Sequence, residues 1–135
     1  AAARIAASPI TVEVVHGSAE VVPFPDRSFD CAVSFLTLCS VDNPERVLRE
    51  LRRVLCDDGI LLLMEHGLSG DTGVARWQRR LDPLEVTLAC GCHLTRPVAT
   101  LVADNGFRFR RVKNFYLPGA PRTHGWFTVG AALKA

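Results

Sequence analysis

The 135-residue sequence contains no run of about 18 apolar residues, which is the length that a transmembrane helix needs. It also lacks a strong excess of either charge, because 16 basic and 14 acidic side chains leave a formal charge of only +2. We therefore expect no transmembrane segment and no overall electric field that would attract nucleic acid. A partner has to be recognised at a local site, and we expect that partner to be a small molecule.

The sequence also lacks the cysteine pattern of a disulfide framework. The number of cysteines is odd, and most of them lie inside apolar runs: Cys31, Cys39, Cys56, Cys90 and Cys92. This pattern favours free thiols that pack as small hydrophobic side chains in a reducing compartment. We therefore expect a cytoplasmic location and no redox role for Cys39 or Cys92.

Two short segments contain residue types that bind metals or RNA. Residues 90–93, CGCH, offer three metal ligands, but no second Cys or His pair at ligand spacing completes the set, so we expect no metal site. Residues 108–114, RFRRVKN, mix basic and aromatic side chains, and we interpret them as the solvated face of a strand.

The composition is that of a folded domain, with 48% hydrophobic and 22% charged residues. A chain of this length is long enough to bury a core, so residues 1–135 are expected to form one domain. Residues 43–56 carry apolar side chains at helical spacing, with Asp42 or Asn43 as the cap and Pro44 in the first turn.

Continuous apolar runs at residues 29–36 and 60–65 flank this helix and predict two strands of a parallel sheet, each covered on both faces. A turn at residues 57–59 separates the helix from the second strand. Ligands are expected at the carboxyl ends of such strands. Further predicted elements are a strand at 11–15, a helix at 71–88 interrupted or kinked at Pro83, a helix capped by Thr95 that ends at Asn105-Gly106, a strand at 107–115 with a bulge near Arg110, and an antiparallel strand at 127–133.

Five segments follow one another along the chain: HGSAE, PFPDRSFD, SFLTLCS, NPERVLRELRRVL and ILLLMEH. In this order they resemble the class I S-adenosylmethionine (SAM)-dependent methyltransferases of the ubiquinone/menaquinone-biosynthesis and type 11 group. GCHLTR at 91–96, after WQRRLDPL, is most similar to the branch that includes the alkyl-thiol methyltransferases. The resemblance covers about residues 10–133, and its specificity lies in the order of the segments.

The resemblance implies an α/β, Rossmann-like sheet that is mostly parallel, with an antiparallel C-terminal strand. It implies SAM as the cofactor and a small, apolar acceptor, either a thiol or an activated carbon. The family reads adenine through an acidic side chain followed by the N–H of a small residue, which places Gly17, Ser18 and Ala19 at the cofactor. Ser18 is a departure, because a serine is a neutral acceptor where an acid is usual.

The strand ending at Ser34 matches the edge where the family contacts SAM, so Ser34 and the Phe35 backbone are expected at the cofactor. The alternative is a buried serine that bonds to local backbone. His66 is the candidate catalytic base, with Glu65 beside it; the alternative is a histidine that orders its loop or lines the pocket. His93 and Trp77 are candidates for the substrate pocket. The alternative for His93 is a role at the start of a helix, and the alternative for Trp77 is a place in the aromatic core.

Two further departures concern loops. Residues 55–59, LCDDG, stand where the family has a basic residue, a proline and two glycines, so we expect an aspartate at positive φ and a modest loss of stability. The family's N-terminal strands and Gly-rich SAM loop find no counterpart before residue 12. We therefore expect a C-terminal fragment of a methyltransferase. The alternative is a catalytically silent remnant or binding domain that associates with another methyltransferase chain through an exposed sheet edge.

Overall fold

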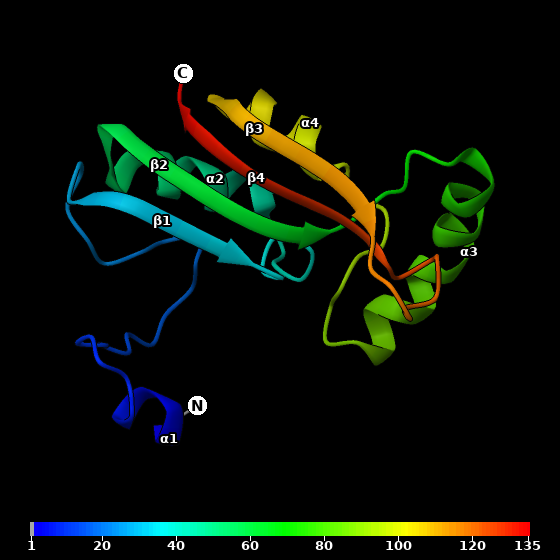
Figure 1. Ribbon diagram of the computed structural model, residues 1–135, viewed down its shortest axis with the longest axis horizontal. Coiled ribbons are helices and arrows are strands. Elements are labelled where there is room, and N and C mark those ends of the chain that lie inside the picture. Colours follow the sequence, from blue (N-terminus) through cyan, green and yellow to red (C-terminus); the bar gives the residue numbers. More distant parts are fainter. Residues whose placement is uncertain (1) are drawn as a thin grey trace.

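Four strands form one mixed sheet in the order β1-β2-β4-β3 in the computed structural model, which describes residues 2–135 (Figure 1). Strand β1 (Phe29–Phe35) pairs in parallel with β2 (Leu55–His66), while β4 (Trp126–Lys134) is antiparallel to both β2 and β3 (Phe107–Tyr116). Three strands therefore point one way and only the C-terminal strand points the other way. This confirms the predicted sheet, with its antiparallel C-terminal strand.

Helix α2 (Pro44–Val54) connects the two parallel strands, as its apolar periodicity predicts. Asn43 is the N-cap, and its side-chain oxygen accepts a hydrogen bond from the Arg46 amide at 2.8 Å. Pro44 occupies the first turn, where a missing N–H leaves no helical bond unmade. The helix start is thus set by local sequence, with Asn43 rather than Asp42 as the cap.

The predicted helices of the second half are both present. Helix α3 (Thr72–Leu88) is capped by the Asp71 carboxylate and continues past Pro83 without interruption. Helix α4 (Val98–Asp104) ends at Asn105, and Gly106 follows it at a φ of +82°. The predicted cap by Thr95 is wrong, because Pro97 is the N-cap residue and the first turn has no side-chain cap.

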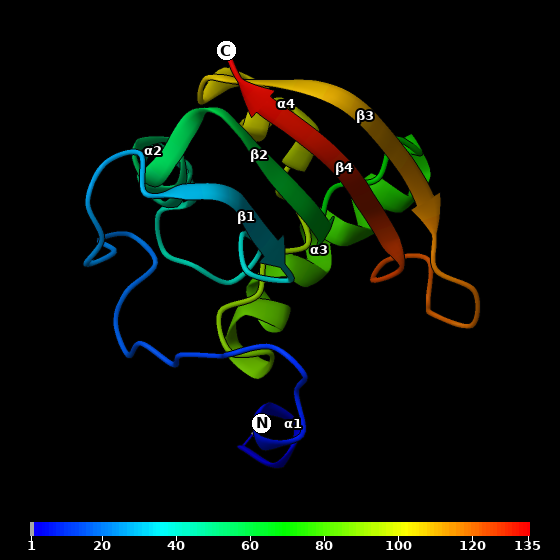
Figure 2. The ribbon, with the colours of Figure 1, turned by 60° about the vertical axis from the view of Figure 1, so that its left-hand side comes forward.

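Helices α2 and α4 cover the same face of the sheet in both views (Figures 1 and 2). The main core lies under them and includes Leu48, Leu61, Val102 and Phe107. No helix within residues 2–135 covers the opposite face of the sheet at β1 (Figure 2). Val33 of this strand is 71% exposed. The prediction that residues 29–36 are covered on both faces is therefore wrong for the part of the chain that the structure describes.

The predicted strand at residues 11–15 is also wrong, because residues 7–28 form no helix or strand. Val12, Val14 and Val15 are exposed in this segment. A strand needs a neighbouring backbone to satisfy its amides, and none of the described residues pairs with this one. The β-branched composition alone therefore does not form a strand here. Helix α1 (Ala2–Ala6) precedes this irregular segment.

Strand β2 begins earlier than predicted, because residues 57–59 belong to the strand instead of forming a turn. Neither Asp57 nor Asp58 adopts a positive φ, so the expected aspartate strain is wrong. Gly59 is required for another reason: a Cβ there would lie 2.9 Å from the Cys56 carbonyl oxygen. The predicted bulge in β3 is confirmed by a register shift between Phe109 and Arg111. No helix among the described residues is long and apolar enough to cross a membrane.

Candidate functional site

The loop that contains three of the predicted cofactor residues forms one wall of a pocket of about 210 Å³. Gly17, Ser18 and Ala19 line this pocket together with the apolar side chains of Val22 and Phe24. The Ser18 hydroxyl already accepts a bond from the Glu20 amide at 3.1 Å, so its own loop occupies part of its hydrogen-bonding capacity. The Ala19 amide donates to no other residue in the part of the chain that the structure describes.

Glu20 holds this loop at the start of α2. Its carboxylate accepts a hydrogen bond from the Asn43 amide at 2.9 Å, and Asn43 is the cap of that helix. Because α2 begins on the carboxyl side of β1, the bond places the loop at the edge of the sheet where the parallel strands end. Glu20 therefore lies near the edge where open α/β sheets bind their ligands, while Val22 and Phe24 extend the pocket along α2 toward the last turn of that helix.

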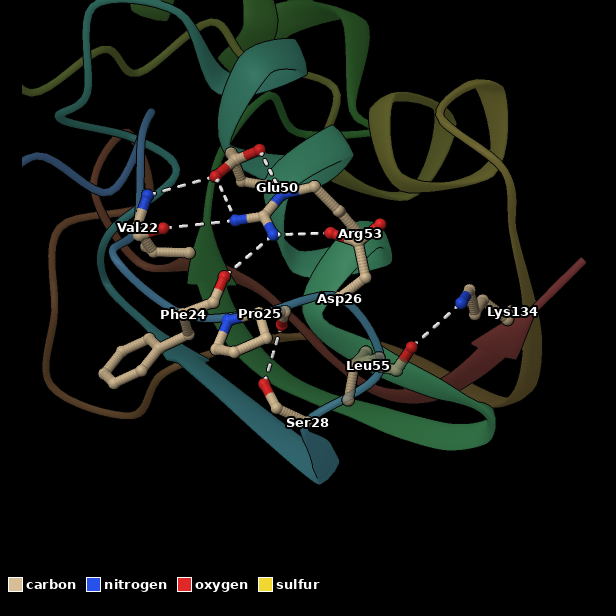
Figure 3. Close-up of polar contacts among 9 residues, drawn as sticks. All are labelled: Val22, Phe24, Pro25, Asp26, Ser28, Glu50, Arg53, Leu55 and Lys134. Carbon is tan, nitrogen blue, oxygen red and sulfur yellow. Dashed lines mark hydrogen bonds and ion pairs between the residues drawn. The ribbon is translucent and has the colours of Figure 1, made fainter.

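Two side chains of α2 hold the rest of this segment in place (Figure 3). Glu50 accepts a bond from the Val22 amide at 3.0 Å, and Arg53 donates to the carbonyl oxygens of Val22 and Phe24 at 3.1 and 2.8 Å. Arg53 also pairs with Asp26 at 2.7 Å and with Glu50 at 2.8 Å. The Arg53 guanidinium lowers the pKa of Glu50 to about 2. We name this group of bonds the α2 clamp, and it fixes the PFPD turn without any strand pairing.

The carboxyl ends of β1 and β2 bring Ser34 and Glu65 together in the interior. The Ser34 hydroxyl donates to Glu65 Oε1 at 2.6 Å, and the Thr37 amide donates to the same oxygen at 3.0 Å. Glu65 is 0% exposed, and its Oε2 has no partner among the described residues. Ser34 is thus committed to a carboxylate rather than to local backbone. Phe35, in contrast, is 59% exposed at the strand end.

His66 is the last residue of β2, and burial lowers the pKa of its ring. The imidazole is therefore neutral near pH 7, which suits a proton acceptor or a metal ligand. Its Nε2 lies 2.7 Å from the Cys92 Sγ, and its buried Nδ1 has no partner among residues 2–135. The Cys39 Sγ lies close by, and burial raises the pKa of that thiol to about 12.

The two candidates for the substrate pocket lie in different settings. His93 is half-buried, and its Nδ1 bonds to the Asp82 carboxylate at 3.0 Å, which joins α3 to the loop after it. Trp77 is 57% exposed on α3, and the Arg80 guanidinium lies 5.3 Å above its ring. His93 thus lies beside Cys92, whereas Trp77 belongs to the helix surface.

A family model described as a methyltransferase domain matches residues 1–63. A thiol S-methyltransferase of Rattus norvegicus is 44% identical over 72 residues, which are 53% of this chain and 30% of that protein. A ubiquinone/menaquinone biosynthesis C-methyltransferase of an Enterobacter species is 32% identical over 114 residues, 84% of this chain and 39% of that protein.

Solved structures agree with these sequence matches. A SAM-dependent methyltransferase of Thermotoga maritima, described as a possible histamine N-methyltransferase, is 25% identical with a TM-score of 0.65, covering 92% of this chain and 65% of that one. The chain is similar to part of a class I methyltransferase domain, in sequence over residues 1–63 and in fold over most of its length. A Bacillus halodurans structure with a TM-score of 0.74 and 17% identity, covering 98% and 76% of the two chains, shows the same fold.

The chain spans only part of its curated relatives, 30% and 39% of the two described above. SAM is the cofactor that the family and its structural neighbours imply. The lining of the pocket at Gly17, Ser18 and Ala19 is chemically compatible with an adenine ring, because it is largely apolar and the Ala19 N–H donates to no described residue.

Two features of the site were not predicted from the sequence. Glu65 was noted only as a neighbour of His66, although its carboxylate is the buried hydrogen-bond centre of this edge. The approach of Cys39 to His66 and Cys92 was also not predicted, because 27 positions separate Cys39 from His66 and a further 26 separate His66 from Cys92 along the chain. Only the predicted topology could have indicated that Cys39 and His66 are close. Cys39 follows β1 and His66 ends β2, and these parallel strands end at the same edge of the sheet.

Proposed function

We propose that this chain forms the carboxyl-terminal part of a SAM-dependent methyltransferase that acts on a small, apolar acceptor. The observation that carries the proposal is the pocket at Gly17, Ser18 and Ala19, in which the Ala19 amide donates to no described residue and the loop is tied through Glu20 to the start of α2. Ala19 N–H would donate to the adenine, and Ser18 would line the same ring. SAM, when bound, supplies the methyl group.

A thiol is the first acceptor that we propose. Two thiol S-methyltransferases, from Rattus norvegicus and Homo sapiens, are 44% and 47% identical to this chain over 72 residues. A ring carbon is the second, because the quinone-biosynthesis C-methyltransferase matches over a longer stretch at 32% identity. Both acceptors need alignment with the methyl group, and a base is needed only where the acceptor must lose a proton.

Within this proposal Ser34 and the Phe35 backbone form the edge beneath the cofactor, and His66 is the candidate base. The lowered pKa of His66 keeps its ring neutral and able to accept a proton, and burial is the cause. His93 and Trp77 remain candidates for the acceptor pocket. The Asp82 carboxylate would fix the orientation of the His93 ring through its Nδ1.

The experiment is a methyl-transfer assay with radiolabelled SAM. It compares this chain with a longer version that carries an N-terminal segment of the kind found in the relatives, since this chain spans only 30% and 39% of two of them. An alkyl thiol and a quinol are the two acceptors. We expect transfer to the thiol by the longer version. Transfer to the quinol alone would remove the thiol proposal, and transfer to neither would contradict methyltransferase activity.

A catalytically silent binding domain is the second candidate. Strand β1 is an edge of the sheet, and Val33 and Phe35 on it are 71% and 59% exposed, which is the kind of surface that another chain covers. This candidate predicts association with a methyltransferase chain, measured by analytical ultracentrifugation, together with no methyl transfer. A monomer at micromolar concentration with measurable transfer would contradict it.

The cytoplasmic location and the absence of nucleic-acid partners belong to the same proposal. All five cysteines are free in the structure, which fits a reducing compartment. The near-balanced charge of +2 fits a small neutral partner better than a phosphate backbone.

A further inference from the structure

Two sulfur atoms and one ring nitrogen lie close together at the carboxyl edge of the parallel strands. The Sγ atoms of Cys39 and Cys92 and the Nε2 atom of His66 all lie within 4.8 Å of one another. Cys39 comes from the loop after β1, His66 ends β2, and Cys92 lies in the loop between α3 and α4. Three separate parts of the fold therefore supply this cluster.

We propose that Cys39, His66 and Cys92 bind one zinc-class transition-metal ion through two sulfurs and one ring nitrogen. Thiolate and imidazole are the ligands that Zn²⁺ prefers in proteins, with Zn–S near 2.3 Å and Zn–N near 2.0–2.1 Å. Such bond lengths place the ligand atoms of a tetrahedral ion roughly 3.5–3.8 Å apart. The 2.7 Å between His66 Nε2 and Cys92 Sγ would open by about 1 Å, which side-chain rotation supplies.

The backbone around the two cysteines is held in place by bonds that do not involve the sulfurs. The His93 amide donates to the Cys39 carbonyl oxygen at 2.8 Å, so the segment bearing Cys92 is tied directly to the segment bearing Cys39. The Arg96 guanidinium donates to the Leu38 carbonyl oxygen, and to that of Val41 at 2.6 Å. The cysteines are thus positioned before any ion binds, which lowers the ordering cost of a metal site.

The turn before Cys92 also fits this close approach. Gly91 has a φ of +85°, and a Cβ there would lie 3.3 Å from the Ser40 carbonyl oxygen. Glycine therefore allows the Cys92 loop to pack on the loop that follows β1.

Three protein ligands leave a fourth position free for water or another small ligand. This is the arrangement of catalytic zinc sites, whereas structural zinc sites use four protein ligands. A metal-bound His66 could not take up a proton at Nε2, so this role replaces the base role at that atom. The inference does not depend on the proposed methyltransferase activity, since it concerns binding of the ion alone.

The first test measures Co²⁺ and Zn²⁺ binding to the reduced 135-residue chain by optical absorption and dialysis. We expect one ion per chain, thiolate-to-cobalt charge-transfer absorption, and its loss when Zn²⁺ displaces Co²⁺. Cys39→Ser, Cys92→Ser and His66→Ala should each weaken binding at least tenfold, the smallest loss seen even for residues that only support a metal ligand. Cys90→Ser is the matched control and should bind as the parent does, because Cys90 lies two residues from Cys92 but is exposed.

The second test uses the unaltered chain, so it does not depend on whether a variant folds. The reaction of each cysteine with an alkylating reagent is followed by mass spectrometry, with and without Zn²⁺. Zn²⁺ should slow the alkylation of Cys92 while Cys90 reacts at the same rate. The proposal would be overturned if Zn²⁺ slowed the alkylation of Cys90 and Cys92 equally, or if the chain bound no stoichiometric metal ion. It would also be overturned if binding survived all three substitutions, or if a Cys39–Cys92 disulfide formed and its reduction restored no metal binding.

Discussion

At the scale of single residues, Gly67 has the least room for a Cβ among the glycines of the described chain. A Cβ there would lie 2.2 Å from the Arg96 carbonyl oxygen, which also accepts the Leu68 amide. Gly67→Ala must therefore push backbone apart, and we expect it to lower the free energy of unfolding by about 1–3 kcal/mol. Urea denaturation checks this. Gly70→Ala in the same loop is the control and should be near neutral, because its Cβ would be no closer than 3.7 Å to Trp126; equal losses would contradict the steric explanation.

The bond from Ser34 to Glu65 predicts that this buried hydroxyl contributes to stability. Ser34→Ala leaves the buried Glu65 carboxylate with the Thr37 amide as its remaining donor, which should cost about 1.5–3 kcal/mol of stability. Ser28→Ala, which removes an exposed hydroxyl bond to Pro25, should cost well under half as much and is the matched control. Chemical denaturation measures both. If Ser34→Ala leaves stability unchanged, the Ser34 bond to Glu65 is not an important interaction.

Some residue roles follow from neighbouring letters and others do not. Asn43 and Pro44 could be assigned to the start of α2 because capping depends on a few consecutive residues. Glu65 could not be assigned as the partner of Ser34, nor Cys39 as the neighbour of Cys92, because the fold alone brings these pairs together. The expectation of no metal site depended on ligand spacing along the chain, and that spacing says nothing about ligands from separate loops.

At the scale of elements, the α2 clamp replaces strand pairing as the support of residues 22–26 (Figure 3). Arg53→Ala removes the donors to Val22, Phe24 and Asp26 together, so this segment should become open to proteases and exchange its amide protons faster. Hydrogen exchange by mass spectrometry measures the change. Arg49→Ala is the control, because Arg49 lies on the exposed face of the same helix. Unchanged exchange of residues 22–26 in Arg53→Ala would show that the clamp does not order them.

The same clamp predicts a loss of stability in acid. The pKa of Glu50 falls from its ordinary value of 4.5 to about 2 in the folded chain, chiefly through its bond to Arg53. A folded pKa below the unfolded one contributes stability above pH 4.5, and that contribution is lost as the pH falls toward 2. After allowance for solvent screening we expect a loss of about 1 kcal/mol. Urea unfolding of the parent and of Glu50→Gln between pH 4.5 and 2 measures this loss. The free energy of unfolding should fall less steeply with pH in the variant, and an equal fall in both proteins would contradict the role of Glu50.

Elements with their own periodicity could be predicted, and those that depend on partners could not. The helix at 43–56 and the bulged strand at 107–115 carry their patterns within themselves and are present as α2 and β3. Residues 11–15 are β-branched and still form no strand, because no described backbone pairs with them. The start of β2 was misplaced because residues 57–59 look like a turn, while Gly59 packs closely on Cys56 within the strand.

At the scale of the whole molecule, helices α2 and α4 lie on one face of the sheet within residues 2–135 (Figures 1 and 2). Apolar side chains of β1, such as Val33 and Phe35, are exposed. The chain also spans only 30% and 39% of two curated relatives. A methyltransferase site that is divided between this chain and further residues should bind SAM weakly in this chain alone. Two charged cofactor hydrogen bonds are worth roughly 10²- to 10⁴-fold in affinity.

The most direct measurement is a calorimetric titration of SAM into this chain and into a version that carries an N-terminal segment of the relatives' kind. We expect micromolar binding by the longer version and binding about 10²- to 10⁴-fold weaker by the 135-residue chain. Ala19→Pro in the longer version should weaken binding, because it removes the amide at the pocket, while Ala19→Gly keeps that amide and should not. Micromolar binding by the 135-residue chain would contradict the division of the site, and no binding by either version would contradict SAM dependence.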